Sequence, residues 1–189
     1  MRRLSHYDYW QDRLKKSILC ESGADMLIYG MGEKPICELV RRLTALCDNQ
    51  DGVISSSDIH SPALSSIPQT AYLTRKYESD ENDITLYSHE ECLADKKKQA
   101  SNFRHIEEES NKYSASRITQ EVDNKVVVVN PPYPPPTIRE LDAVYALPFT
   151  RLPHPRYKGK EIPAYNMIRH SVTLHRGCFG GCAFCTISA

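Results

Sequence analysis

The 189-residue sequence lacks a long apolar run, an excess of charge of one sign and any internal repeat. No stretch approaches the roughly 18 apolar residues of a membrane-spanning helix, and the N-terminal segment MRRLSHYDYWQDRLKK has no apolar signal core. Basic and acidic side chains balance at 24 each, so the chain as a whole has no electrostatic preference for nucleic acid or acidic membranes. We therefore expect a soluble, cytoplasmic protein with no membrane partner and no clear nucleic-acid binding.

A disulfide framework is absent as well. The seven cysteines are an odd number, and a reducing cytoplasm disfavours disulfides. Four of them are scattered, and we interpret these as small buried apolar residues: Cys20, Cys37, Cys47 and Cys92. The other three form the pattern CxxxCxxC near the end of the sequence: Cys178, Cys182 and Cys185.

The first part of the chain has the pattern of an α/β protein. Residues 7–16 have helix-forming content, and the apolar run ADMLIYG over 24–30 is typical of a strand buried on both faces. An amphipathic helix follows in EKPICELVRRLTALCD, with Pro35 in its first turn. Strand, glycine turn and helix predict a β-α unit of a parallel sheet, although one unit alone cannot form such a sheet.

The middle of the chain predicts a charged helix and a hairpin. SHEECLADKKKQASNFRHIEEESNKY opens with Ser88 as an N-cap and a glutamate three residues later, and its apolar residues fall on one broad side: Leu93, Ala100, Phe103 and Ile106. The Lys96–Lys98 triplet indicates either surface charge or a patch for nucleic acid. Asp123 and Asn124 separate two apolar segments and suit a two-residue β-turn.

Proline dominates the next stretch. Most of the twelve prolines fall between residues 131 and 163, beginning with NPPYPPP, which predicts an extended backbone with one short helix around IRELDAVYA. This segment is interpreted as a stiff strap over the chain's own surface, with a ligand for an aromatic groove of a partner as the alternative. A last strand signal, HSVTLHRG, leads into the cysteine loop.

Three cysteines at this spacing indicate a metal or an iron-sulfur centre. Gly180 and Gly181 let the loop curl so that the three sulfurs converge, and converging thiolates repel one another unless a positive centre neutralises them. Three ligands on a four-iron cluster would leave one iron open. The alternatives are structural zinc, with His170 or His175 as the fourth ligand, and a non-catalytic interaction module formed by the strap and the charged helix.

The cysteine loop resembles the signature of radical S-adenosylmethionine (SAM) enzymes. An aromatic residue, Phe184, stands just before the last cysteine, as in those enzymes. Together with upstream sequence segments, the loop resembles the YgiQ-type radical SAM family, and the resemblance covers nearly the whole chain. The segments that carry it are HYDYW, GADMLIYGMGE, VVVVNPPYPPPT, LPHPRY, IPAYNMIRHSV and RGCFGGCAFC.

The resemblance implies the cofactors and the site. Cys178, Cys182 and Cys185 would ligate three irons of a 4Fe-4S cluster, the open iron would chelate S-adenosylmethionine, and Phe184 would lie near the adenine. An electron from a donor protein would then cleave the cofactor to a 5′-deoxyadenosyl radical that acts on an unknown substrate. The catalytic residues beyond the cluster ligands stay unknown.

The resemblance also implies a fold class and three regions. We expect an incomplete α/β chain, with the end of a Rossmann-like, cobalamin-binding-like unit and the first strand, Ser171–Leu174, of a β/α barrel. The expected regions are an N-terminal region over 1–125, a proline-rich connector over 126–166 and the start of the radical SAM core over 167–189. We also expect the chain to be a fragment that is inactive alone.

Overall fold

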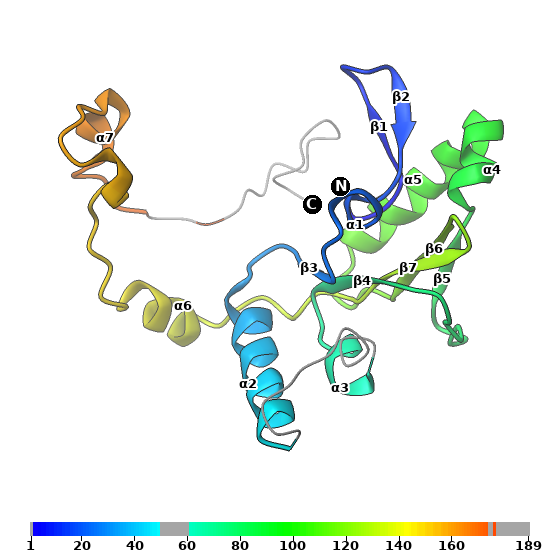
Figure 1. Cartoon of the computed structure of the whole chain (residues 1–189), viewed down its shortest axis with the longest axis horizontal. Coiled ribbons are helices and arrows are strands. Elements are labelled where there is room, and N and C mark those ends of the chain that lie inside the picture. The colour runs from blue at the N-terminus through cyan, green and yellow to red at the C-terminus, as the bar shows by residue number, and fades with distance from the viewer. Residues whose placement is uncertain (1, 50–60, 174–175, 177–189) are drawn as a thin grey trace. The chain divides into compact units, whose positions relative to one another are not determined.

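The computed structural model describes residues 2–49, 61–173 and 176 (Figure 1). The chain divides into two compact units, Met1–Pro134 and Pro135–Ala189. Both β-sheets that the structure describes lie in the first unit, and short helices form the described part of the second. No helix within these described ranges is long and apolar enough to cross a membrane.

The first unit is built around a five-stranded sheet with the strand order β3-β4-β7-β6-β5. The strands β5 and β6 run parallel, and the other neighbours are antiparallel. The strands of both sheets are β1 (His6–Asp8), β2 (Arg13–Lys15), β3 (Met26–Ile28), β4 (Thr70–Thr74), β5 (Ile84–Leu86), β6 (Ile118–Val122) and β7 (Lys125–Val129). The helices are α1 (Ile18–Ser22), α2 (Glu33–Asn49), α3 (Pro62–Ser65), α4 (His89–Ala94) and α5 (Lys96–Ser110).

The sheet confirms the mixed α/β class but not a parallel neighbour for β3. Strand β3 pairs antiparallel with β4, lies at the edge of the described sheet and is half-buried. The expectation of a parallel strand buried on both faces is therefore wrong for this segment. An apolar run indicates that a strand is buried, whereas the direction of the neighbouring strand depends on residues that are distant in the sequence. The Rossmann-like assignment and the barrel stay predictions.

Residues 6–15 form a hairpin of β1 and β2, so the helix indicated by the content of residues 7–16 is not found. One carboxylate oxygen of Asp8 accepts hydrogen bonds from the backbone N–H groups of Trp10, at 3.0 Å, and Gln11, at 3.1 Å. This local bonding of an aspartate to the backbone competes with helix formation. The turn exposes Trp10 by 91% and Tyr9 by 78%, and the two rings meet edge to face.

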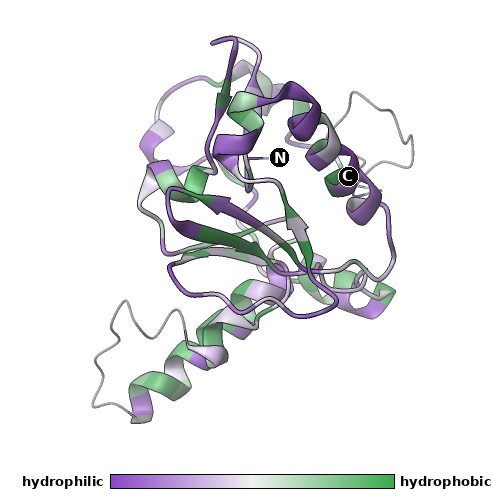
Figure 2. Ribbon diagram, turned by 90° about the vertical axis from the view of Figure 1, so that its right-hand side faces the viewer, coloured by the Kyte–Doolittle hydropathy of each residue, from purple (hydrophilic) through white to green (hydrophobic). Residues whose placement is uncertain are grey.

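One face of the sheet forms the main apolar core. The central strands β4 and β7 contribute Ala71, Val127 and Val129, which are at most 5% exposed. Residues from β5, β6, α1 and the N-terminal segment complete the cluster: Leu4, Leu19, Leu86, Ile118 and Val122. Figure 2 shows apolar colour running along the strands of this sheet. Burial of these side chains supplies the main stabilisation of the unit.

The predicted turn between β6 and β7 is confirmed. Asp123 has φ of 48° and Asn124 has φ of 58°, and the two strands pair up to this turn. Two consecutive residues in the left-handed region define a type I′ turn, whose twist matches that of a hairpin.

We expect the effect of a substitution at Asn124 on stability to depend on how well the new residue tolerates the left-handed backbone there. Glycine has no Cβ to oppose a positive φ, so Asn124→Gly should change the free energy of unfolding little or raise it by about 0.5 kcal/mol. Asn124→Val should lower it by about 1–2 kcal/mol because a branched side chain disfavours this conformation. Urea unfolding of both variants measures the difference, and equal stability of the two would contradict a left-handed residue at this position.

The charged segment forms two helices in place of the single one predicted. Ser88 and Glu91 make the predicted capping box of α4, but Asp95, with φ of −137° and ψ of 110°, ends that helix and N-caps α5. The predicted apolar side is wrong for Leu93, Ala100 and Phe103, which are exposed, whereas Ile106 is half-buried and packs against the core. The residues that these helices bury are mostly polar: His89, Cys92, Asn102 and Glu109.

Buried hydrogen bonds explain why α4 and α5 present polar residues to the sheet. The side-chain amide of Asn102 accepts from the backbone N–H of Tyr87 and donates to its carbonyl oxygen, both at 2.9 Å. The amide of Gln120 on β6 also donates to this carbonyl, at 3.0 Å, and accepts from the backbone N–H of Ser5, at 2.8 Å. The hydroxyl of Ser5 lies 2.9 Å from Nδ1 of His89. Each polar group is satisfied, so the network costs little to bury.

We expect His89 to make the stability depend on pH. Burial is the main cause that lowers the pKa of this imidazole below 6.5. The unfolded chain therefore binds the proton more readily than the folded chain. The contribution of the neutral imidazole to the free energy of unfolding is complete above pH 6.5 and is lost as the pH falls below that value. The loss is at most about 1.4 kcal/mol per pH unit. Between pH 7.5 and pH 5.5, the free energy of unfolding measured with urea should fall less for His89→Asn than for the parent. The exposed control His105→Asn should behave as the parent does, and an equal loss in all three would contradict the assignment.

The described part of the second unit consists of α6 (Ile138–Tyr145), a short 3₁₀ helix η2 (Pro155–Tyr157) and α7 (Pro163–Ile168). The short helix expected around IRELDAVYA is confirmed as α6, which Thr137 caps. The strand expected at Ser171–Leu174 is not found in its described part. Residues 171–173 belong to no strand, and the backbone N–H of Ser171 donates to the carbonyl of Ile168. A strand needs a paired neighbour, and the described residues offer none here.

Candidate functional site

The predicted cluster site lies outside the described residues. This applies to the three thiolate ligands and to the aromatic residue beside them: Cys178, Cys182, Phe184 and Cys185. Their arrangement therefore stays a prediction. Of the two histidines considered for zinc, His175 also lies outside, and His170 is exposed.

The residues that the structure describes form no other metal centre. Among them, no three side chains of histidine, cysteine, aspartate or glutamate gather closely enough to hold an ion. Of the four free thiols there, Cys92 is buried, Cys20 and Cys47 are half-buried, and Cys37 is exposed, so the predicted burial is wrong for Cys37. Burial raises the pKa of the Cys20 and Cys92 thiols, which keeps both protonated and unreactive at neutral pH.

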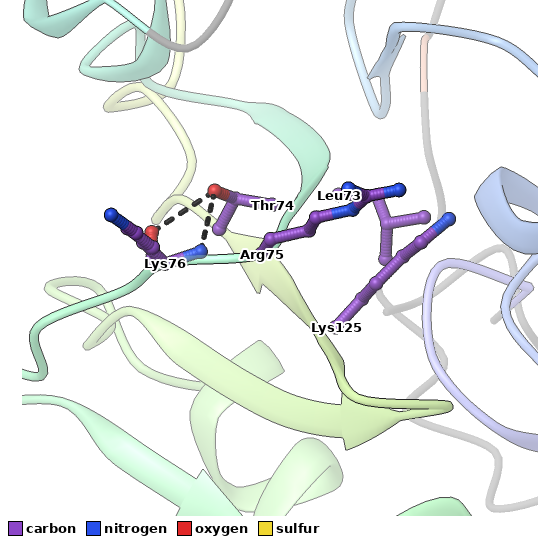
Figure 3. Close-up of a pocket in the computed structure, with 5 residues that line it drawn as sticks. All are labelled: Leu73, Thr74, Arg75, Lys76 and Lys125. Carbon is purple, nitrogen blue, oxygen red and sulfur yellow. Dashed lines mark hydrogen bonds between the residues drawn. The ribbon is translucent and has the colours of Figure 1, made fainter.

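A basic pocket opens at the end of β4, beside the start of β7 (Figure 3). Its volume is about 410 Å³, and five residues line it: Leu73, Thr74, Arg75, Lys76 and Lys125. The hydroxyl of Thr74 donates to the carbonyl of Lys76 at 3.0 Å and accepts from its backbone N–H at 3.3 Å. These bonds fix the backbone that carries two of the three cationic side chains.

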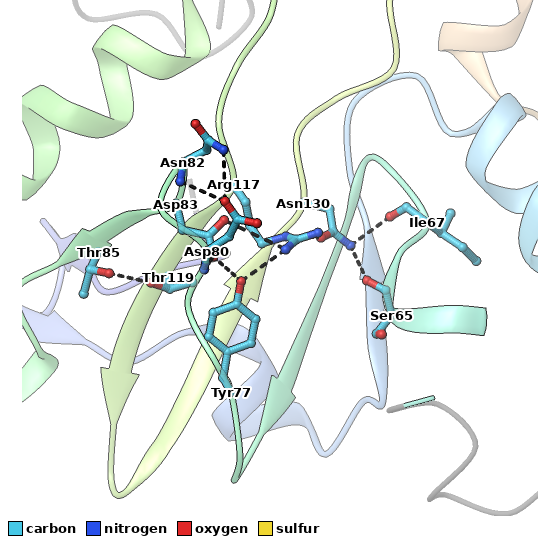
Figure 4. A network of polar contacts seen from close by, with 10 residues as sticks. All are labelled: Ser65, Ile67, Tyr77, Asp80, Asn82, Asp83, Thr85, Arg117, Thr119 and Asn130. Carbon is cyan, nitrogen blue, oxygen red and sulfur yellow. Dashed lines mark hydrogen bonds and ion pairs between the residues drawn. The ribbon is translucent and has the colours of Figure 1, made fainter. Parts of the chain in front are cut away.

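On another part of the first unit, Asn130 ties the end of β7 to its neighbours (Figure 4). Its buried side-chain amide donates to the carbonyl oxygens of Ser65, at 2.7 Å, and Ile67, at 2.9 Å, and to the hydroxyl of Thr70, at 3.0 Å. Its carbonyl oxygen accepts from Nε of Arg117 at 2.9 Å. One side chain therefore links the residues after β7 to α3, β4 and the segment before β6.

Arg117 extends this cluster to Tyr77 and Asp83 (Figure 4). Its Nη1 donates to the hydroxyl of Tyr77 at 3.2 Å, and that hydroxyl donates to a carboxylate oxygen of Asp83. Burial, together with the bond to Asp83, raises the pKa of Tyr77 to about 12. The phenol therefore keeps its proton near neutral pH and acts as a structural donor, not as a base.

Gln69 holds the first residues of the proline-rich segment. Its side-chain amide donates to the carbonyl oxygens of Tyr29, at 2.5 Å, and Met31, at 2.6 Å, and accepts from the backbone N–H of Tyr133 at 3.3 Å. Its own backbone N–H donates to the carbonyl of Pro131 at 2.8 Å. Gln69 has a φ of 63°, in the left-handed region that few non-glycine residues adopt.

Asn130 and Gln69 therefore fix the segment NPPY to the first unit. The sequence reasoning missed both roles. An asparagine directly after four valines and directly before Pro131 was an available signal for Asn130, because a polar residue at a strand end must find partners when it is buried. Gln69 lies in a stretch that reads as a polar connector and carries no such signal.

Comparison with known proteins decides the family. The family described as Radical SAM N-terminal matches residues 1–171 of the chain. The chain belongs to the radical SAM N-terminal family. No solved structure matches this family member.

Relatives of this radical SAM N-terminal chain carry the name UPF0313 protein. The chain is 71% identical to one from Bacteroides thetaiotaomicron, 57% identical to one from Porphyromonas gingivalis and 42% identical to one from Methanocella arvoryzae. Each comparison covers 100% of the chain but only 31%, 28% and 29% of these relatives, respectively. The chain therefore spans about three tenths of the length of the curated relatives that it matches.

Proposed function

We propose that this chain is the N-terminal part of a radical SAM enzyme and carries the ligands of its 4Fe-4S cluster. The observation that carries the proposal is the combination of the family match over 1–171 with the CxxxCxxC pattern that follows it. The described cysteines, histidines and carboxylates form no competing metal centre. The soft thiolates Cys178, Cys182 and Cys185 are the donors that iron-sulfur clusters use.

The chain's own residues have three tasks in this proposal. The three thiolates would hold the cluster and leave one iron without a protein ligand, and Phe184 would lie near the adenine of S-adenosylmethionine. When bound, the cluster supplies one electron that splits the cofactor into methionine and a 5′-deoxyadenosyl radical. The buried bonds of Asn130 and Gln69 fix the start of the segment that leads toward the cysteine loop.

In this proposal a cytoplasmic electron donor protein supplies the electron. A catalytic barrel and its substrate pocket would, in this proposal, lie outside this chain, which covers only 31% and 28% of two of its relatives. We therefore expect the chain to bind the cluster without turning over a substrate by itself.

Anaerobic reconstitution with iron and sulfide tests the proposal. Chemical analysis should give about four irons and four acid-labile sulfides per chain, together with a brown colour that dithionite bleaches. A colourless chain that holds one zinc and no labile sulfide would instead support the structural zinc site. His170 or His175 would then be the fourth ligand to examine.

A further inference from the structure

The segment over residues 2–16 combines exposed aromatic rings with a local excess of positive charge. Five of its side chains are basic and two are acidic, an excess that the balanced charge of the whole chain hides. The exposed rings are those of Tyr7, Tyr9 and Trp10. Exposed rings interleaved with basic side chains are typical of surfaces that bind nucleic acid.

The β1–β2 hairpin holds these rings in place before any ligand binds. The carboxylate of Asp8 accepts from the backbone N–H groups of Trp10 and Gln11 and lies 3.3 Å from Nζ of Lys15. The rings of Tyr9 and Trp10 meet edge to face with their centroids 5.8 Å apart. Figure 1 shows the hairpin extending beyond the five-stranded sheet. A ligand can therefore contact the rings without first ordering them, which favours binding.

The hairpin also leaves one guanidinium group without a protein partner. The carboxylate of Asp12 accepts from the hydroxyl of Tyr7, and that of Asp8 is bound as described. Arg13 is exposed, and its side chain forms no hydrogen bond or ion pair with another described residue. The register sets Arg13 opposite Asp8, the residue directly before Tyr9. A free guanidinium beside the turn can bind phosphate oxygens through two parallel N–H groups.

The surroundings of the rings favour a nucleic acid over a protein as the ligand. The neighbours of Tyr9 and Trp10 in the turn are polar or charged, namely Asp8, Gln11 and Asp12. The centre of a protein interface is instead depleted of charged residues. Every nucleotide base has a flat face that stacks on an aromatic ring. The bases must be unpaired, because the base faces inside a duplex are already stacked on one another.

We propose that the tip of the β1–β2 hairpin binds a single strand of nucleic acid. Tyr9 and Trp10 stack on unpaired bases, and Arg13 binds a phosphate of the same strand. The proposal goes beyond the radical SAM function and does not depend on the cysteine loop, because all three residues belong to the first unit.

The fluorescence of Trp10 tests the proposal, because this residue is the only tryptophan of the chain. An unstructured RNA strand of about 12 nucleotides should quench it when added to the full 189-residue chain, since a stacked base lies against the indole. The affinity should fall as the salt concentration rises. The same strand annealed to its complement should quench much less. No quenching by the single strand, or equal quenching by the duplex, would overturn the proposal.

Substitutions of exposed side chains separate stacking from general charge attraction, with the anisotropy of a labelled strand as the readout. Trp10→Ala should bind at least about fivefold more weakly, whereas Tyr113→Ala, which removes an exposed ring elsewhere, should bind as the parent does. Arg13→Gln should weaken binding and reduce its salt dependence more than Lys97→Gln, which removes one charge from the exposed start of α5. Equal weakening in each variant and its control would overturn the proposal.

Two further titrations identify what contacts the tip. The same strand made of DNA separates two sources of the ligand. Tighter binding of RNA identifies a contact with the 2′-hydroxyl groups, equal binding identifies recognition of bases and phosphates alone, and both results support the proposal. Dilution of the chain without nucleic acid should leave the fluorescence per chain unchanged. A change on dilution, with no effect of the strand, would identify a contact between copies of the chain and overturn the proposal.

Discussion

Replacement of Asn130 by leucine is expected to lower the free energy of unfolding by about 3–5 kcal/mol. Leucine keeps the volume of the side chain but removes the two amide N–H groups, which three acceptors share, and the one accepted bond. The carbonyl oxygens of Ser65 and Ile67 and the Nε of Arg117 would lose these partners inside the unit. Each buried polar group left without a partner costs about 1–3 kcal/mol. Urea unfolding followed by circular dichroism measures the loss.

The exposed Asn82 provides a matched control for this substitution. Its side-chain amide makes one hydrogen bond, to Asp80 at 3.0 Å, so Asn82→Leu should cost less than about 1 kcal/mol. Equal losses for the two asparagines would contradict the role of Asn130 as the link between α3, β4 and the proline-rich segment.

Loss of any one thiolate of the cysteine loop should remove the cluster. After anaerobic reconstitution, Cys178→Ala, Cys182→Ala and Cys185→Ala should each retain at least about tenfold less iron than the parent, since even outer-shell partners of a metal site cost this much. The exposed free thiol Cys37 is the control, and Cys37→Ala should reconstitute fully. Iron and labile sulfide analysis gives the readout. Full iron content in all three loop variants would show that the cluster has other ligands.

Local signals in the sequence predicted local structure well. The left-handed turn at Asp123 and Asn124 and the N-cap at Ser88 depend on residues within a few positions, and both are confirmed. The hairpin at residues 6–15 was missed because the helix-forming content of this stretch outweighed the backbone bonds that Asp8 makes. These bonds are also local, but they become visible only once the turn has formed.

Non-local pairing explains the larger differences. The apolar segment that forms β3 carried no information about its antiparallel partner β4, which lies far along the chain. The amides of Asn102 and Gln120 looked like surface residues because polar side chains are usually exposed. Their burial follows from backbone groups of Tyr87 and Ser5 that need partners once the helices pack on the sheet. The cysteine site depends on spacing and resemblance, and the described residues do not test it.

The most direct test of the radical SAM assignment is EPR spectroscopy of the reconstituted, dithionite-reduced chain, with and without S-adenosylmethionine. An open iron that binds the amino and carboxylate groups of the cofactor should change the signal of the reduced cluster when the cofactor is added. The chain Cys37→Ala should show the same change as the parent. A reduced cluster whose spectrum is identical with and without the cofactor would contradict an open-iron site formed by Cys178, Cys182 and Cys185.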